Sequence, residues 1–125
     1  MFSHIMIGSS DIERSKKFYD ATLGKLGAKA GEQDKQGRMI YAHDGGRLML
    51  SKPLNGAEAT GANGGTIGFK AGSSEEVDAW HKAGVENGGT TCEDPPGPRQ
   101  GGSGQLYLAY LRDPDGNKLC ALHRM

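Results

Sequence analysis

The sequence predicts an α+β fold in which one domain is built from two similar halves. Residues 4–29 and 66–91 align without gaps at an offset of 62 (66 − 4). In each stretch a short apolar strand precedes a Ser/Asp/Gly break, an amphipathic helix and a glycine, and further strands follow later. A length of 125 residues suits one compact domain. We place the first half at about residues 1–56 and the second at about 62–125.

Both helices have recognisable starting residues. Ser10 or Asp11 can cap the first helix, and Ser73 or Ser74 the second, because a side-chain oxygen there accepts a hydrogen bond from a free backbone N–H. Apolar side chains then recur near helical spacing, and glycines provide natural stops. We therefore expect one helix in each half, directly after the first strand.

Each helix is followed by a pair of strands joined by a tight turn. The predicted strands are residues 38–43, 47–52, 105–112 and 118–123, and the turns are Asp44-Gly45-Gly46 and Asp113-Pro114-Asp115-Gly116-Asn117. The two aspartates of the second turn are predicted to accept hydrogen bonds from nearby N–H groups. The stretch 51–65 is a small-residue linker. The stretch 92–105 is predicted to be a long loop, rich in proline and glycine, of a kind that often carries function.

Charge and composition exclude several classes of partner. Fifteen basic and fifteen acidic residues balance, and the isoelectric point is near 6.9, so no basic surface for nucleic acid or an anionic membrane is expected. No apolar run approaches the length of a membrane span, and no secretory leader is visible. We predict a cytoplasmic protein whose Cys92 and Cys120 are reduced thiols, with one intramolecular disulfide as the alternative.

Two runs of sequence carry a resemblance to a known family. They are HIMIGSSDIERSKKFYDATLGKLG at residues 4–27 and YLRDPDGNKLCAL at 110–122. With the duplicated halves, they resemble the vicinal oxygen chelate superfamily, which includes glyoxalase I, extradiol dioxygenases, fosfomycin-modifying enzymes and bleomycin resistance proteins. The resemblance implies two tandem βαβββ modules forming curled mixed sheets around a cleft, with a small molecule as ligand or substrate. It also implies a homodimer, in which a second copy covers exposed sheet edges.

The same resemblance implies four positions for ligands of a divalent metal. The first strand of each module places His4 and Thr66 there, and the strand after the last turn places Cys120 in the second module. The matching residue of the first module is Met49 or Leu50, depending on how the hairpin aligns. Catalytic metals need about three protein ligands or several carboxylates, and only one imidazole remains. We therefore predict no cofactor, with a divalent metal (Ni, Zn, Mn or Fe) at His4 as the alternative.

Individual side chains suggest roles in catalysis or binding. His4 is the candidate catalytic residue, because imidazole titrates near neutral pH; a hydrogen-bonded core histidine is the alternative. Tyr107 and Tyr110 lie three apart on one strand and must face opposite sides, and we predict that Tyr107 lines the cleft. Arg99 can clamp a carboxylate or phosphate, although a solvated loop arginine is the alternative. The predicted substrate-binding residues are Tyr107, Arg99, Thr66, Cys120 and Met49.

Two kinds of function remain open, and a degenerate family member with neither is the third alternative. The first is a metal-independent protein that binds or acts on a small molecule in the cleft, as bleomycin resistance proteins bind theirs. The second is a metal-dependent lyase or dioxygenase of the same superfamily, similar to lactoylglutathione lyase. The loss of ligands at three of four implied positions favours the first.

Overall fold

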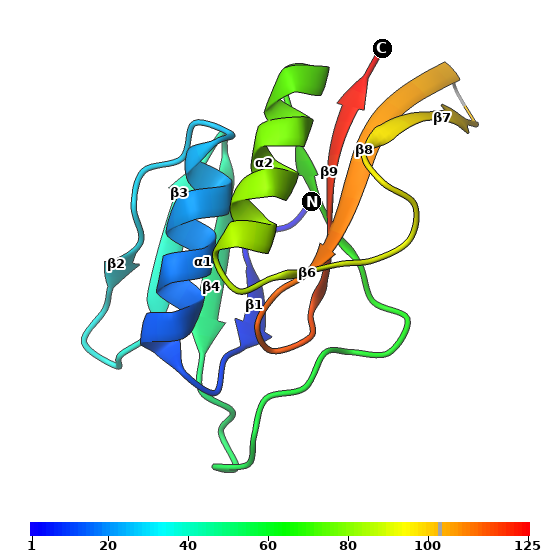
Figure 1. Ribbon diagram of the computed structural model, residues 1–125. Helices are drawn as coiled ribbons and strands as arrows, with labels where there is room; N and C mark the ends of the chain where they lie inside the picture. Colours follow the sequence, from blue (N-terminus) through cyan, green and yellow to red (C-terminus); the bar gives the residue numbers. More distant parts are fainter. Residues whose placement is uncertain (103) are drawn as a thin grey trace.

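The computed structural model describes residues 1–102 and 104–125. Figure 1 shows two helices lying side by side on one side of two sheets. The elements follow the order β1 (Ile5–Gly8), α1 (Ile12–Gly24), β2 (Glu32–Gln33), β3 (Met39–His43), β4 (Gly46–Ser51), β5 (Ile67–Lys70), α2 (Ser74–Glu86), β6 (Thr90–Thr91), β7 (Gly97–Gly101), β8 (Gly104–Arg112) and β9 (Lys118–Arg124).

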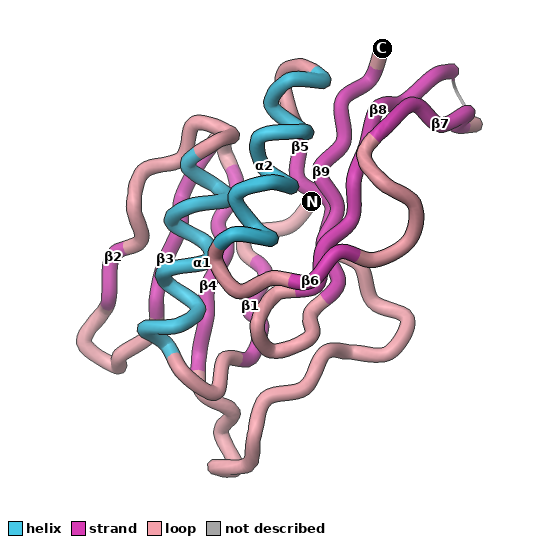
Figure 2. Tube along the Cα trace, viewed as in Figure 1, coloured by secondary structure: helices cyan, strands magenta, loops and turns pink. Residues whose placement is uncertain are grey.

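The two sheets repeat one topology, which confirms the predicted α+β fold of two similar modules. The first sheet has the strand order β1-β4-β3-β2, and the second β5-β9-β8-β6, with β7 also paired to β8. In both, the first strand runs parallel to the last strand of its module, and the later strands pair antiparallel. A helix crosses between them, as a parallel connection requires. Figure 2 shows β3 and β4 of the first sheet behind α1, with β8 and β9 of the second sheet to the right of α2.

The turns and caps explain where the elements begin and end. The side chain of Asp11 caps α1 by accepting from the Arg14 N–H, and Ser73 caps α2 by accepting from the Glu76 N–H. Asp44 and Gly45 both have positive φ angles, 50° and 81°, between β3 and β4. That geometry belongs to a two-residue hairpin turn whose twist matches the strands.

One apolar core lies between the helices and the sheets. Trp80 of α2 and Phe18 of α1 are completely buried, and they pack with buried side chains from β3, β4, β8 and β9. The Nε1 group of Trp80 is buried without a hydrogen-bond partner among the described residues. Both helices pack against this core, so within the described residues the opposite face of each sheet carries no helix.

The predicted loop at 92–105 is partly wrong. Its residues Gly97–Gly101 form β7, which pairs antiparallel with β8 through registers such as Pro98 with Tyr107. Proline lacks an N–H donor and is tolerated on a strand whose other side is unpaired. The composition therefore concealed an edge strand. Ser103 of the predicted loop lies outside the described residues.

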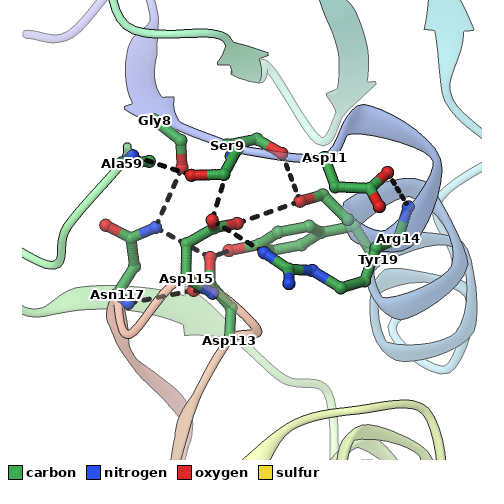
Figure 3. A network of polar contacts seen from close by, with 11 residues as sticks. Gly8, Ser9, Asp11, Arg14, Tyr19, Ala59, Asp113, Asp115 and Asn117 are labelled. Atoms are coloured by element: carbon green, nitrogen blue, oxygen red, sulfur yellow. Dashed lines mark hydrogen bonds and ion pairs between the residues drawn. The ribbon is translucent and has the colours of Figure 1, made fainter. Parts of the chain in front are cut away.

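The turn of residues 113–117 fastens the second module to helix α1 of the first (Figure 3). Asp113 accepts hydrogen bonds from the N–H groups of Asp115 and Asn117 at 2.9 Å, as predicted for a turn-forming aspartate. Its other oxygen accepts from the Tyr19 hydroxyl of α1 at 2.5 Å. Burial and the Asp113 carboxylate hold the pKa of Tyr19 well above its usual value, so this hydroxyl stays a neutral donor.

Asp115 makes the second half of the same connection. Its carboxylate accepts from the Ser10 N–H at 2.9 Å, from Arg14 Nη2 at 2.9 Å and from the Ser15 hydroxyl at 3.2 Å. The side chain of Asp115 is 1% exposed, although that of Arg14 is 47% exposed. The sharp acidic turn before the last strand therefore joins groups about a hundred residues apart in the sequence.

Candidate functional site

The register settles which first-module residue matches Cys120. Met6 pairs with Met49 across β1 and β4, and Gly68 pairs with Cys120 across β5 and β9. Gly68 stands 62 positions after Met6, which is the repeat offset of the sequence. Met49 and Cys120 therefore occupy equivalent places in the two modules, and Leu50 is excluded because it belongs to the core.

Both equivalent side chains lie on the helix-free faces of their sheets. Leu48 and Leu50 flank Met49 and pack in the core, and Leu119 and Ala121 do the same around Cys120. Successive side chains of a strand point to opposite faces, so Met49 and Cys120 point away from the helices. Both are nevertheless mostly covered, at 8% and 5% exposure.

His4 and Thr66 immediately precede β1 and β5. Both are exposed, and each stands two positions before the residue paired with Met49 or Cys120. The imidazole Nδ1 of His4 lies 2.8 Å from the Ser3 hydroxyl. The alternative of a buried core histidine is therefore wrong, because the ring stands at the surface.

A polar cluster occupies the helix-free face of the second sheet. The Lys118 ammonium lies 4.8 Å from the centre of the Tyr110 ring and forms an ion pair with Glu93. Tyr110 is the cross-strand partner of Cys120, and Arg112 that of Lys118. An aromatic ring, a cation and a carboxylate thus stand beside the buried thiol. This is a surface on which apolar and charged parts of one ligand can both find partners.

Electrostatics keep the thiol and the phenol of this cluster neutral. Burial and the Glu93 carboxylate raise the pKa of Cys120 to about 11, against the opposing effect of Lys118 and Arg99. Burial also raises the pKa of Tyr110, with the thiol and Glu93 adding to the effect. Hydrogen bonding to Glu93 raises the pKa of Lys118. Near neutral pH the cluster offers a protonated thiol, a phenol that can donate, and an ammonium group.

The face predicted for Tyr107 is wrong. Its ring packs against the core, and its hydroxyl donates to Asp78 Oδ1 at 2.8 Å, on helix α2. Tyr110 lies on the opposite face, as the three-residue spacing requires. Sequence alone could not choose between them, because apolar neighbours flank both tyrosines.

Arg99 lies on β7 rather than in a loop. Its guanidinium donates to the Pro95 carbonyl at 2.8 Å and to the Pro98 carbonyl at 3.2 Å. These bonds hold the group close enough to influence the pKa of Cys120 and of Tyr110. Glu93, Lys118 and Tyr110 were missed as site residues. The available signal was the strand alternation that puts Lys118 and Cys120 on one face.

The four positions implied by the family resemblance do not fit a divalent metal. His4 can supply one ring nitrogen, whereas Met49 carries a thioether and Thr66 a neutral hydroxyl. Cys120 would bind as a thiolate, which its raised pKa disfavours. Three strong protein ligands are normal for a catalytic zinc, and carboxylates for harder ions. Among the described residues, no group of three or more His, Cys, Asp and Glu side chains could hold a metal ion. The predicted absence of a cofactor stays a prediction.

No helix in the described ranges is both long enough and apolar enough to cross a membrane.

Comparison with protein-family models gives a match over residues 1–121 to the Glyoxalase/Bleomycin resistance protein/Dioxygenase superfamily. None of the curated proteins compared with the chain matches it.

Solved structures share the fold. A glyoxalase/bleomycin resistance protein from Albidiferax ferrireducens T118 is 59% identical, with 99% of each chain covered and a TM-score of 0.95. A glyoxalase-related enzyme from Fulvimarina pelagi is 19% identical, covering 99% of this chain and 88% of its own, with a TM-score of 0.77. A glyoxalase/bleomycin resistance protein/dioxygenase family enzyme from Burkholderia phytofirmans PsJN is 16% identical, covering 98% of both chains, with a TM-score of 0.74. At such low identity, the last two show the fold alone.

Proposed function

Because the chain belongs to the glyoxalase/bleomycin resistance protein/dioxygenase superfamily, we propose that it binds a small organic molecule on its helix-free sheet faces without a divalent metal. The observation that carries this proposal is the pair Met49 and Cys120. They stand at equivalent, mostly covered positions where a metal site of the implied kind would need strong ligands. A thioether and a protonated thiol provide an apolar floor instead.

The surroundings suit an amphipathic ligand. Leu108 and Leu122 extend the apolar floor on the face that carries Cys120, and the Tyr110 ring gives a surface for stacking. Lys118 and Glu93 supply charged partners at one edge. A ligand with an aromatic or apolar body and a polar end matches this division, which is common in small-molecule sites.

A second copy of the chain belongs to this proposal. β1 and β5 each pair on one side only within the described sheets. The exposed apolar side chains Phe2 (74%) and Met6 (43%) lie just before and on β1. A homodimer would cover such edges and side chains. Two free cysteines are compatible with the reducing cytoplasm, where we propose that the protein works. Light scattering of the purified protein tests the dimer.

The binding test uses metal-free bleomycin in buffer with a chelator, measured by calorimetry. We expect saturable binding that chelator does not change. Tyr110→Ala should weaken it about tenfold or more through loss of the stacking surface, whereas Tyr107→Phe, on the helix-covered face, should not. Equal effects of the two substitutions would contradict the assignment of the face. If bleomycin fails to bind, the same pair of variants tests other aromatic and peptide-like ligands.

A metal-dependent lyase is the second candidate, and exposed His4 is the observation that favours it. Its test is lyase activity on the methylglyoxal–glutathione adduct with added Ni²⁺ or Zn²⁺. We expect no rate above that of the metal alone. A metal-dependent rate that disappears in His4→Ala would establish the lyase and overturn the metal-free proposal.

A further inference from the structure

A cavity of about 290 Å³ lies where the edges of the two sheets approach the end of helix α1. Its apolar wall comes from both modules and includes Ile5, Leu23, Tyr41, Leu48, Ile67 and Phe69. These side chains belong to the core or pack against it. The cavity is therefore on the helix side of the sheets, and none of His4, Thr66, Met49 and Cys120 lines it.

The rim of the cavity is polar and carries more positive than negative charge. Arg47 at the start of β4 and Lys70 at the end of β5 both line it and are both exposed. Neither cationic group makes a hydrogen bond or ion pair with any residue that the structure describes. Asp44 is the one carboxylate among the lining residues, and His43 is the remaining titratable side chain apart from Tyr41. Two cationic side chains and one carboxylate therefore line the rim.

Size and shape define the class of ligand. Ligand sites in proteins run from roughly 300 to 1,000 Å³ and combine apolar walls with a few polar groups, so this cavity stands at the small end. A water molecule occupies about 30 Å³ in the liquid, and the cavity therefore holds roughly ten non-hydrogen atoms. An apolar tail of that size would fill the wall region, and an anionic end would meet the unpaired cations at the rim.

We propose that this cavity is a binding site for a small apolar carboxylate, such as a medium-chain fatty acid, with Arg47 and Lys70 as the carboxylate-binding residues. The site takes residues from both modules, so an occupied cavity also links the two sheets. It does not depend on the ligand proposed for the helix-free faces, because the two sites share none of the positions on which that proposal rests.

The test uses sodium octanoate, which has ten non-hydrogen atoms, with 1-octanol as the matched probe that lacks the charge. Binding is measured by calorimetry and by chemical-shift changes in the amide spectrum. We expect octanoate to bind about tenfold tighter than octanol, with shifts centred on β1, β4 and β5. Arg47→Gln with Lys70→Gln should remove that preference, whereas Lys17→Gln on the exposed face of α1 should preserve it.

A substitution that fills the cavity separates binding in it from binding elsewhere. Ala28 lines the cavity and packs against the core, so Ala28→Leu extends a side chain into the cavity on the helix side of the sheets. Ala30 is exposed and does not line the cavity, which makes Ala30→Leu the matched control. We expect Ala28→Leu to reduce octanoate affinity at least about tenfold and Ala30→Leu to leave it unchanged, with both variants folded by circular dichroism. Equal affinity for octanoate and octanol, or undiminished binding by Ala28→Leu, would overturn the proposal.

Discussion

Replacing Asp115 by alanine tests the connection between the second module and helix α1. The buried carboxylate accepts three hydrogen bonds, from the Ser10 N–H, from Arg14 and from the Ser15 hydroxyl. Without it, the half-exposed Arg14 turns to solvent at little cost. The Ser10 N–H and one hydroxyl of the Ser9–Ser15 pair, which lie 2.5 Å apart, lose a partner.

The expected loss of stability follows from the Ser10 N–H and the serine hydroxyl, the two donors left without a partner. Leaving a buried donor unpaired costs roughly 1–3 kcal/mol, so Asp115→Ala should lower the free energy of unfolding by roughly 2–4 kcal/mol. The whole free energy of unfolding of a domain of this size is about 5–15 kcal/mol, so the change is large. It should lower the melting temperature by roughly 10 °C. Urea unfolding followed by circular dichroism gives the free energy, and calorimetry gives the melting temperature.

Two further variants show whether the reasoning is right. Asp115→Asn keeps an oxygen for the Ser10 N–H and should cost about 1 kcal/mol, because it loses mainly the charge. Arg14→Ala removes the exposed partner alone and should cost under about 1 kcal/mol. If Asp115→Ala costs no more than Arg14→Ala, the buried donors do not stabilise the connection and the reasoning is refuted.

Three other predictions concern neighbouring features. Tyr19→Phe removes the donor to Asp113 and should cost about 1–3 kcal/mol in urea unfolding; an unchanged midpoint would contradict the role of that hydroxyl. Gly61→Ala places a Cβ against the backbone carbonyl of Gly116 and should destabilise the fold by about 1–3 kcal/mol, whereas Gly65→Ala, with contacts no closer than 3.4 Å, should not. With Cys92 replaced by serine, Cys120 should react with iodoacetamide at pH 8 about a hundredfold more slowly when folded than in urea, since burial raises the pKa of the folded thiol to about 11 from 9.0 for an unperturbed thiol. Equal labelling rates in the folded and unfolded protein would refute the raised pKa. The same raised pKa means that the stability contributed by the neutral thiol is present below pH 9 and is lost as the pH rises from about 9 to 11.

Local signals in the sequence predicted much of the fold. The Asp44-Gly45 turn and the caps at Asp11 and Ser73 depend on neighbours a few residues away, and their chemistry is visible in the sequence. The repeat predicted that the modules share one topology. The strand β7 was missed because Pro98 and its flanking glycines disfavour strands in general, although an unpaired edge tolerates them.

The missing parts of the candidate site depend on contacts between distant segments. Alternation showed that Tyr107 and Tyr110 face opposite sides, but only the position of Asp78 on α2 reveals which one the helix covers. Whether Met49 or Leu50 matches Cys120 depended on the strand register. The ion pair of Glu93 with Lys118 joins residues 25 positions apart, across a segment without a periodic pattern.

The metal content of the purified protein tests the central claim most directly. Elemental analysis for Ni, Zn, Mn and Fe would be combined with calorimetric titration of the metal-free protein by Ni²⁺ and Zn²⁺. We predict far less than one metal ion per chain and only weak binding that His4→Ala does not change, because Met49, Thr66 and Cys120 do not provide the further ligands. About one tightly bound ion per chain, lost in His4→Ala, would contradict the account.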